Sequence, residues 1–220
     1  MNTSARREYR SELRSQQADQ TRARVAQAAA GLFVRDGYAA TSINAVARAA
    51  GVSAQTVYNI FGTKAAVLKA AYDIALVGDA DPVPLAERAD VRALYADPDP
   101  VRFLRGYARL GRTVLDRAGA LMLQVMAGAA AGQEDLVALS RTTNAERLVG
   151  TGMVAHRLAE LDALAPGLSV DRARDRIWTL NSVEVWHLVT GTLGWTDDDY
   201  QERIGDLMCA ATLRPELRSG

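Results

Sequence analysis

The sequence predicts an all-α fold. Apolar residues recur at steps of three and four along most of the 220 residues, which is the spacing of one helical face. No stretch shows the sustained alternation or the β-branched enrichment that is typical of strands. Glycine and proline stand between the periodic segments, where they end helices. We therefore expect a chain of helices that are joined by short breaks.

The first helix is expected over residues 21–35, and Gly37 supplies the left-handed residue that ends it. The Arg-rich residues before this helix form either an arm or an extension of it. One apolar stripe is predicted to face the core, and it contains Val25, Ala28, Ala29, Leu32 and Phe33.

Two very short helices follow. Thr41 or Ser42 caps a helix that ends at Gly51, and Ser53 caps a second helix over residues 54–61. Gly62 ends that helix, and Thr63 caps a fourth helix over residues 64–77. Two short helices around a tight turn with glycine are typical of a helix-turn-helix. An ordinary corner between two helices is the alternative.

A weakly structured stretch with Pro82 and Pro84 separates this region from a larger helical part. We divide the chain into an N-terminal domain, residues 1–70, and a C-terminal domain, residues 71–220. Glycine and proline predict the breaks between the later helices, among them Gly119 and Gly194. These helices are expected at residues 84–96, 99–116, 118–131, 133–164, 170–191 and 197–213.

The formal net charge of zero hides an asymmetry. Residues 1–70 hold ten basic and four acidic residues, a net charge of +6, which leaves residues 71–220 with a net charge of −6. A basic segment joined to an acidic remainder indicates a nucleic-acid-binding part attached to one that does not bind it.

Several other classes of protein are excluded by composition. The single Cys209 cannot form an internal disulfide, and two scattered histidines do not form a zinc site of the usual spacing. The polar N-terminus lacks the apolar core of a signal peptide. The longest uncharged stretch, residues 118–133, is too short to cross a bilayer. We expect a cytoplasmic protein without a membrane segment, a metal or a cofactor.

A run of residues between about 25 and 68 has a specific order and spacing. It contains Leu32-Phe33, Asp36-Gly37-Tyr38, Thr41-Ser42-Ile43, Val46-Ala47, Ala50-Gly51-Val52-Ser53, Thr56-Val57-Tyr58, Phe61, Lys64 and Leu68. In this order and spacing the N-terminal sequence resembles the DNA-binding domain of the TetR family of transcriptional regulators. One position departs from the family pattern: Ile60 stands where the family often has His or Tyr.

The resemblance implies that the second short helix enters the major groove of double-stranded DNA. Gln55 can pair with adenine, Ala54 and Tyr58 can contact thymine methyl groups, and Asn44 can reach another base. Lys64 would hold a phosphate at the start of the fourth helix. The phosphate contacts that the resemblance implies are Thr41, Ser42, Thr56, Tyr58 and Asn59.

Each assignment has an alternative that does not involve DNA. Thr41, Ser42 and Ser53 would cap helices in any protein. Tyr58 can be a packing residue, and Gln55 and Asn59 can simply be solvated.

The last two predicted helices, residues 170–191 and 197–213, carry broad apolar faces. The resemblance implies that they pair with their copies in a homodimer, which would read a palindromic operator through two recognition helices. The alternative is that these faces form the core of a monomer.

The resemblance also implies a small-molecule pocket between the linker and the dimer helices. Methionines, aromatic rings and a few polar groups suit a largely apolar effector. For each residue a core position is the alternative, and His156 can be a structural histidine. The candidates are Phe103, Tyr107, Leu121, Met122, Val125, Met126, Met153, His156, Trp178 and Asn181.

We therefore expect a homodimeric repressor that a small effector releases from its operator. A helical DNA-binding regulator without a small-molecule response is the first alternative, and an all-helical enzyme is the second. The run Gly150–Ala155 matches a nucleotide-binding pattern, but it follows no strand, so we treat the match as chance.

Overall fold

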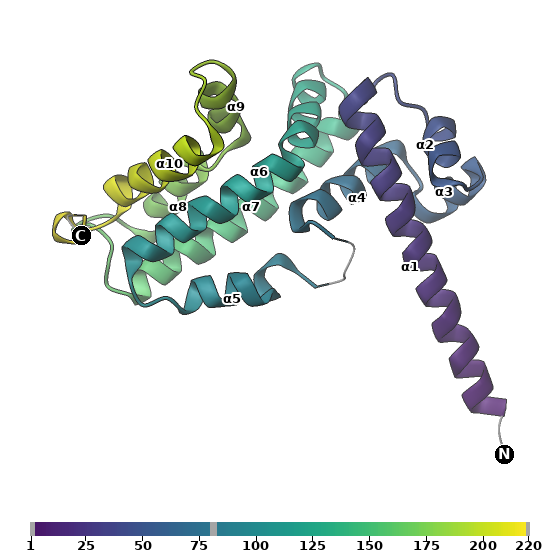
Figure 1. The fold of residues 1–220 in the computed structure, drawn as a ribbon, viewed down its shortest axis with the longest axis horizontal. Helices are drawn as coiled ribbons and strands as arrows, with labels where there is room; N and C mark the ends of the chain where they lie inside the picture. Colours follow the sequence, from purple (N-terminus) through teal and green to yellow (C-terminus); the bar gives the residue numbers. More distant parts are fainter. Residues whose placement is uncertain (1–2, 80–82, 219–220) are drawn as a thin grey trace. The chain divides into compact units, whose positions relative to one another are not determined.

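The computed structural model describes the backbone of residues 3–79 and 83–218 and the side chains from residue 17 onward (Figure 1). Helices account for all of its named elements, which confirms the all-α prediction. Residue contacts divide the chain into two compact units, with the boundary in the sequence between residues 80 and 81. The first unit contains α1 (Thr3–Asp36), α2 (Ile43–Ala50), α3 (Ala54–Phe61) and α4 (Lys64–Val77). The second unit contains the short 3-10 helix η1 (Leu85–Glu87), α5 (Ala89–Ala96), α6 (Pro100–Ala130), α7 (Glu134–Glu160), α8 (Val170–Leu180), α9 (Val183–Gly191), α10 (Asp197–Thr212) and the 3-10 helix η2 (Pro215–Leu217).

The capping residues set the bounds of α2, α3 and α4 as the sequence predicted. The side chains of Ser42, Ser53 and Thr63 each accept a hydrogen bond from a backbone N–H in the first turn of their helix. Gly51 follows α2 with φ of 65°, a conformation that residues with a side chain rarely adopt.

Helix α1 begins much earlier than residue 21. The added residues contain no glycine or proline and are rich in Arg, Glu, Gln and Ala, all of which favour a helix. On its core side, Val25, Ala29 and Phe33 are fully buried, and α1 packs against α2 and α4. Gly37, with φ of 81°, stands at its end as predicted.

The second unit is built around the long helix α6. Helix α10 lies along one side of α6 and α7 along another, and α8 packs on both α7 and α10 (Figure 1). Large apolar side chains without solvent exposure fill the space between these helices. They include Phe103, Leu104, Leu158, Ile177, Tyr200, Ile204 and Met208.

Three predicted helix boundaries in the second unit are wrong. Gly119 does not end a helix, because α6 is continuous from Pro100 to Ala130. Residues 84–96 form η1 and then α5. The predicted helix 133–164 ends at Glu160, and the segment that follows pairs with the chain end through an isolated bridge between Leu164 and Leu213.

The predicted helix 170–191 is also interrupted. Asn181 ends α8, and the Ser182 side chain accepts a hydrogen bond from the backbone N–H of Val185 to begin α9. From α7, the guanidinium of Arg147 donates to the carbonyl oxygens of Trp178 and Asn181, at 3.1 and 3.2 Å. The end of α8 is therefore held by a residue that lies more than thirty positions earlier in the sequence.

The apolar stripe that suggested a dimer helix in α10 faces its own chain. Tyr200, Ile204 and Met208 have no solvent exposure and pack on α6 and α8. Leu207 remains 46% exposed. Most of the apolar face of α10 therefore serves the core of the second unit. No helix in the described part of the chain is both long and apolar enough to span a membrane.

The close approach of the Trp186 ring explains why α6 contains a glycine at position 119. A Cβ atom at this position would lie 2.7 Å from the Trp186 ring, too close for ordinary contact. We expect Gly119→Ala to lower the free energy of unfolding by about 1–2 kcal/mol, because the clash outweighs the better helix propensity of alanine. Urea unfolding followed by tryptophan fluorescence measures this, since Trp178, Trp186 and Trp195 all lie in the second unit.

The matched control is Gly31→Ala in α1, where a Cβ atom meets nothing within 4 Å. This change should raise the stability of the first unit by up to about 1 kcal/mol, as seen by circular dichroism. If both changes stabilise their units equally, the Trp186 ring does not lie close enough to position 119 to exclude a Cβ atom.

Candidate functional site

Helices α2 and α3 form a helix-turn-helix in the first unit. Gly51 and Val52 make the turn, and the N–H groups of both donate to carbonyl oxygens of the last turn of α2. Val57 is fully buried and Phe61 is 9% exposed, so these two side chains anchor α3 to its domain. The opposite face of α3 is exposed to solvent, and Tyr58 on that face is 49% exposed.

The exposed face of α3 is polar and partly organised by its own hydrogen bonds. Gln55 Nε2 donates to Asn59 Oδ1 at 2.8 Å, one helical turn along. The hydroxyls of Ser53 and Thr56 lie 2.8 Å apart and share a hydrogen bond. Ala54 is half-buried beside them. Gln55, Tyr58 and Asn59 therefore lie on one solvent-facing surface, as the sequence predicted for a reading face.

The residues before and within α2 divide into buried and exposed groups. Thr41 is 2% exposed, and its hydroxyl donates to the carbonyl oxygens of Gly37 at 2.8 Å and Leu32 at 3.3 Å. Ser42 caps α2 at the surface, and Asn44 is exposed in the first turn of that helix. The Thr41 hydroxyl is thus engaged inside the domain, whereas Ser42 and Asn44 are open to a partner.

Lys64 stands in the first turn of α4, where we expected a phosphate contact. Its ammonium lies 4.3 Å from the centre of the Tyr38 ring and donates to the carbonyl oxygen of Ala39 at 3.4 Å. Thr63 caps the same helix end. The cation is therefore held close to backbone N–H groups at a helix N-terminus, which favour an anion.

Arg22 contacts the end of α3, which the sequence did not predict. From α1 its guanidinium lies 4.7 Å from the centre of the Phe61 ring and donates to the carbonyl oxygen of Ile60 at 3.4 Å. It therefore contacts the C-terminal end of α3, where a positive charge is favourable. The Ile60 side chain, which departs from the family pattern, is half-buried. The sequence pattern does not predict this contact of Arg22, because it joins residues that are 38 apart in sequence.

Acidic neighbours reduce the basic charge elsewhere in the first unit. Arg35 forms a bidentate pair with Asp36 at 2.7 Å, and its hydrogen bonds lower the pKa of that carboxyl. Lys69 pairs with Asp73 at 2.7 Å. Arg48 is exposed on α2.

In the second unit, three of the predicted ligand residues lie close together around Arg147. The Arg147 guanidinium lies 4.7 Å from the centre of the Trp178 ring and donates to the Asn181 carbonyl. Burial raises the pKa of Tyr107, and a hydrogen bond with Asn181 partly opposes that shift. Three buried atoms in this cluster have no hydrogen-bond partner among the described residues: Trp178 Nε1, Asn181 Oδ1 and the Tyr200 hydroxyl.

The other predicted ligand residues do not join this cluster. Phe103 is fully buried against the edge of Tyr95, with ring centres 5.2 Å apart. His156 is exposed on α7, and its Nδ1 lies 2.8 Å from the carbonyl oxygen of Gly152. The remaining candidates are Leu121 and Val125, which are buried, Met122 and Met126, which are half-buried, and Met153, which is 43% exposed.

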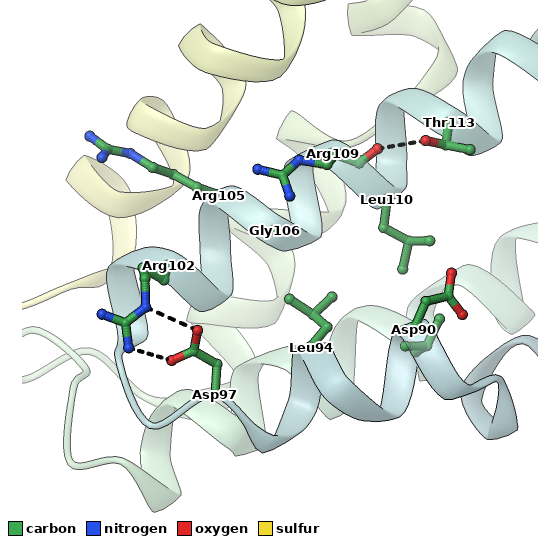
Figure 2. Close-up of a pocket in the computed structure, with 10 residues that line it drawn as sticks. Asp90, Leu94, Asp97, Arg102, Arg105, Gly106, Arg109, Leu110 and Thr113 are labelled. Atoms are coloured by element: carbon green, nitrogen blue, oxygen red, sulfur yellow. Dashed lines mark hydrogen bonds and ion pairs between the residues drawn. The ribbon is translucent and has the colours of Figure 1, made fainter.

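Two cavities lie elsewhere in the second unit. One, of about 510 Å³, lies between α5 and α6, where Leu94 and Leu110 form an apolar floor and arginine side chains an edge (Figure 2). The other, of about 460 Å³, lies between α7 and α8 and is lined by Asn144, Ala145, Leu148, Asp175, Trp178 and Thr179. Of the predicted ligand residues, Trp178 alone lines either of these two cavities. Among the described side chains, no group of His, Cys, Asp or Glu is placed to hold a metal.

Known proteins are similar to this chain in its first unit by sequence and over nearly its whole length by fold. The sequence model described as "Bacterial regulatory proteins, tetR family" matches residues 26–71. No curated protein is significantly similar to the chain in sequence.

Among solved structures, a protein described as a TetR-family transcriptional regulator from Rhodococcus sp. has a TM-score of 0.70 at 16% identity, covering 87% of this chain and 97% of that one. A transcriptional regulator from Saccharomonospora viridis in complex with choline has a TM-score of 0.65 at 18% identity, covering 88% and 98%. A TetR regulator from Streptomyces fradiae has a TM-score of 0.62 at 17% identity, covering 90% and 89%.

The match over residues 26–71 spans α2, α3 and the first half of α4, so it coincides with the helix-turn-helix that the structure shows. The matching model and these structures are described as those of transcriptional regulators, so the comparisons give no support to the enzyme alternative. Residues 26–71 match the sequence model of the TetR family, and the chain has the fold of the TetR-family structures, with its helix-turn-helix in the N-terminal unit.

Proposed function

We propose that the protein is a cytoplasmic repressor that binds a palindromic operator as a homodimer and leaves it when a small, largely apolar effector binds the C-terminal unit. The exposed polar face of α3 is the observation that carries the DNA-binding part of this proposal. Gln55, Tyr58 and Asn59 lie together on that face, while Val57 and Phe61 fix the opposite side.

In this proposal α3 enters the major groove, and Gln55 pairs with a base edge. Gln55 Nε2 is held by Asn59 in the free protein, which limits the rotamers of the glutamine amide before it meets DNA. Ser42 and Lys64 contact phosphates on either side, where a helix N-terminus adds to their attraction for an anion. Thr41 is left out of this interface because its hydroxyl is buried.

Dimerisation supplies the specificity that one eight-residue helix lacks. Two copies related by a two-fold axis read half-sites about 34–36 Å apart. We assign the dimer surface to the predicted helix 170–191, where Leu188 is 57% exposed, together with α7 and not α10, because α7 also carries exposed apolar side chains on one side. These are Leu148, Val149 and Met153, which are 39%, 69% and 43% exposed. The cavity between α7 and α8 beside Leu148 can take an apolar side chain of the second copy.

The effector response is supported by the cavities of the second unit and by the choline complex of one similar structure. An effector that binds the DNA-incompetent dimer better shifts the population away from the operator. A 100-fold release needs a preference of about 2.7 kcal/mol for that state.

The reading face is tested with Gln55→Ala and Tyr58→Ala. Each should weaken binding to DNA from the protein's own upstream region by tenfold or more, because each removes a base or phosphate contact. Gel-shift titration at several salt concentrations measures the affinity. A Lys64→Ala variant should lower the affinity and also the slope of affinity against salt, because one phosphate contact is lost.

Thr41→Val is the matched control for these variants. It should lower the free energy of unfolding by about 1 kcal/mol, since a buried hydrogen bond is lost, and leave the DNA affinity of the folded protein unchanged. If Gln55→Ala and Tyr58→Ala bind as tightly as the unaltered protein, α3 does not read the operator.

The dimer surface is tested with Val149→Glu. Two buried carboxylates in the interface should dissociate the dimer and lower operator affinity at a concentration where the unaltered protein is dimeric. Sedimentation velocity measures the oligomeric state. Leu207→Glu, on the exposed part of α10, is the control and should leave the dimer intact. Dissociation by Leu207→Glu and not by Val149→Glu would move the interface to α10.

A further inference from the structure

Helix α6 carries a row of arginines along one side. Arg102, Arg105, Arg109 and Arg112 follow one another at steps of three, four and three residues, which is the spacing of one helical face. The row stands out in a part of the chain whose net charge is −6. A line of like charges is unfavourable unless opposite charges lie beside it.

Three of the four arginines have a carboxylate partner. Arg102 pairs with Asp97 and Asp99, both at 2.9 Å. Arg105 pairs with Asp206 of α10 at 3.1 Å. These contacts compensate the charges of Arg102 and Arg105, at the N-terminal end of the row, and the Arg105 pair joins α6 to α10.

Arg112, at the other end of the row, lies 3.2 Å from Asp116 and 3.4 Å from Asp197. Arg109 differs from the rest: within the described residues no carboxylate lies within ion-pair distance of its guanidinium. The middle of the row therefore holds one uncompensated positive charge.

The Arg109 side chain lies on the edge of the 510 Å³ cavity between α5 and α6 (Figure 2). Leu94 and Leu110 face each other across the floor of this cavity, and buried Val91 lines it as well. Gly106 lets the two helices come close here, since a Cβ atom at Gly106 would lie 2.5 Å from Leu94 Cδ1. The volume is within the range of small-molecule sites, which is about 300–1,000 Å³.

Two acidic residues line the cavity: Asp97 is paired with Arg102, and Asp90 lies on the wall that α5 forms. Asp90 lies in the first turn of α5, where the helix dipole favours its charge. It repels an anion from that wall, so a negative group in the cavity is favoured at the Arg109 edge. The apolar floor between these two charges suits a hydrocarbon chain.

We propose that this cavity binds a small amphiphilic carboxylate, whose carboxylate pairs with Arg109 and whose apolar chain lies on Leu94 and Leu110. The ligand supplies the carboxylate that the other three arginines of the row already have. A guanidinium and a carboxylate form paired, charge-assisted hydrogen bonds, which makes Arg109 a specific anchor. The role of this ligand as the effector rests on the proposed function, whereas its binding does not.

Isothermal titration calorimetry of the full-length protein with butanoate, hexanoate and octanoate tests the site. Affinity should rise about fourfold for each added methylene, which corresponds to about 0.8 kcal/mol. Octan-1-ol should bind at least tenfold more weakly than octanoate, because it lacks the charge. Arg109→Gln should weaken octanoate binding at least tenfold and leave octan-1-ol binding unchanged.

Arg141→Gln is the matched control, because Arg141 is exposed on α7 and does not line the cavity. It should bind octanoate like the unaltered protein. The absence of saturable binding, or equal binding by the Arg109→Gln and Arg141→Gln proteins, would overturn the proposed site.

A gel shift with the same protein separates the site from the proposed function. Release of DNA by octanoate that disappears with Arg109→Gln supports both. Arg109-dependent binding of octanoate without any change in DNA affinity supports the site and contradicts its role as the effector site.

Discussion

The short helix α3 depends on support from the rest of its domain. It has eight residues, whereas an isolated helix needs about 12–15 residues to persist in water. Ser53 satisfies an N–H group at its start, Val57 and Phe61 bury its inner face, and Arg22 contacts its end. Because these contacts lie on the inner side and at the two ends of α3, its outer side is left exposed without loss of stability. The N-terminal unit therefore presents a stable reading surface even though the helix that carries it would not form alone.

The sequence predicted this part of the fold well because its signals are local. Ser42, Ser53 and Thr63 act through hydrogen bonds within three residues, so their helices begin where these residues occur. The longer helices of the second unit depend on distant contacts. From the sequence, Gly119 was predicted to end a helix, but in the structure it is the position at which the Trp186 ring approaches the continuous helix α6. The interruption after Asn181 was missed because its stabilising partner, Arg147, belongs to another helix.

The same distinction applies to the site residues. The outward positions on α3 follow from helical spacing, so Gln55, Tyr58 and Asn59 could be predicted. The burial of Thr41 could not, because it depends on how the segment after α1 folds back on Leu32. In the second unit, residue type suggested a pocket among methionines and aromatic rings, yet most of these side chains fill the core or face solvent. The two cavities lie between α5 and α6 and between α7 and α8, and residue type alone does not predict where such spaces remain.

The basic residues explain why net charge is a poor guide to the partners of this chain. All but Lys64 and Lys69 of the 26 basic residues are arginines. In the second unit many of them act inside the fold, since a guanidinium can donate several hydrogen bonds to carbonyl oxygens at helix ends. Arginines whose side chains donate to a backbone carbonyl of another segment of this unit include Arg147, Arg157, Arg176 and Arg214. Their guanidinium groups satisfy carbonyl oxygens at helix ends and turns, so these donors are already engaged within the fold. What a basic residue can bind is therefore decided by the contacts that already engage its side chain, which a count of charges does not include.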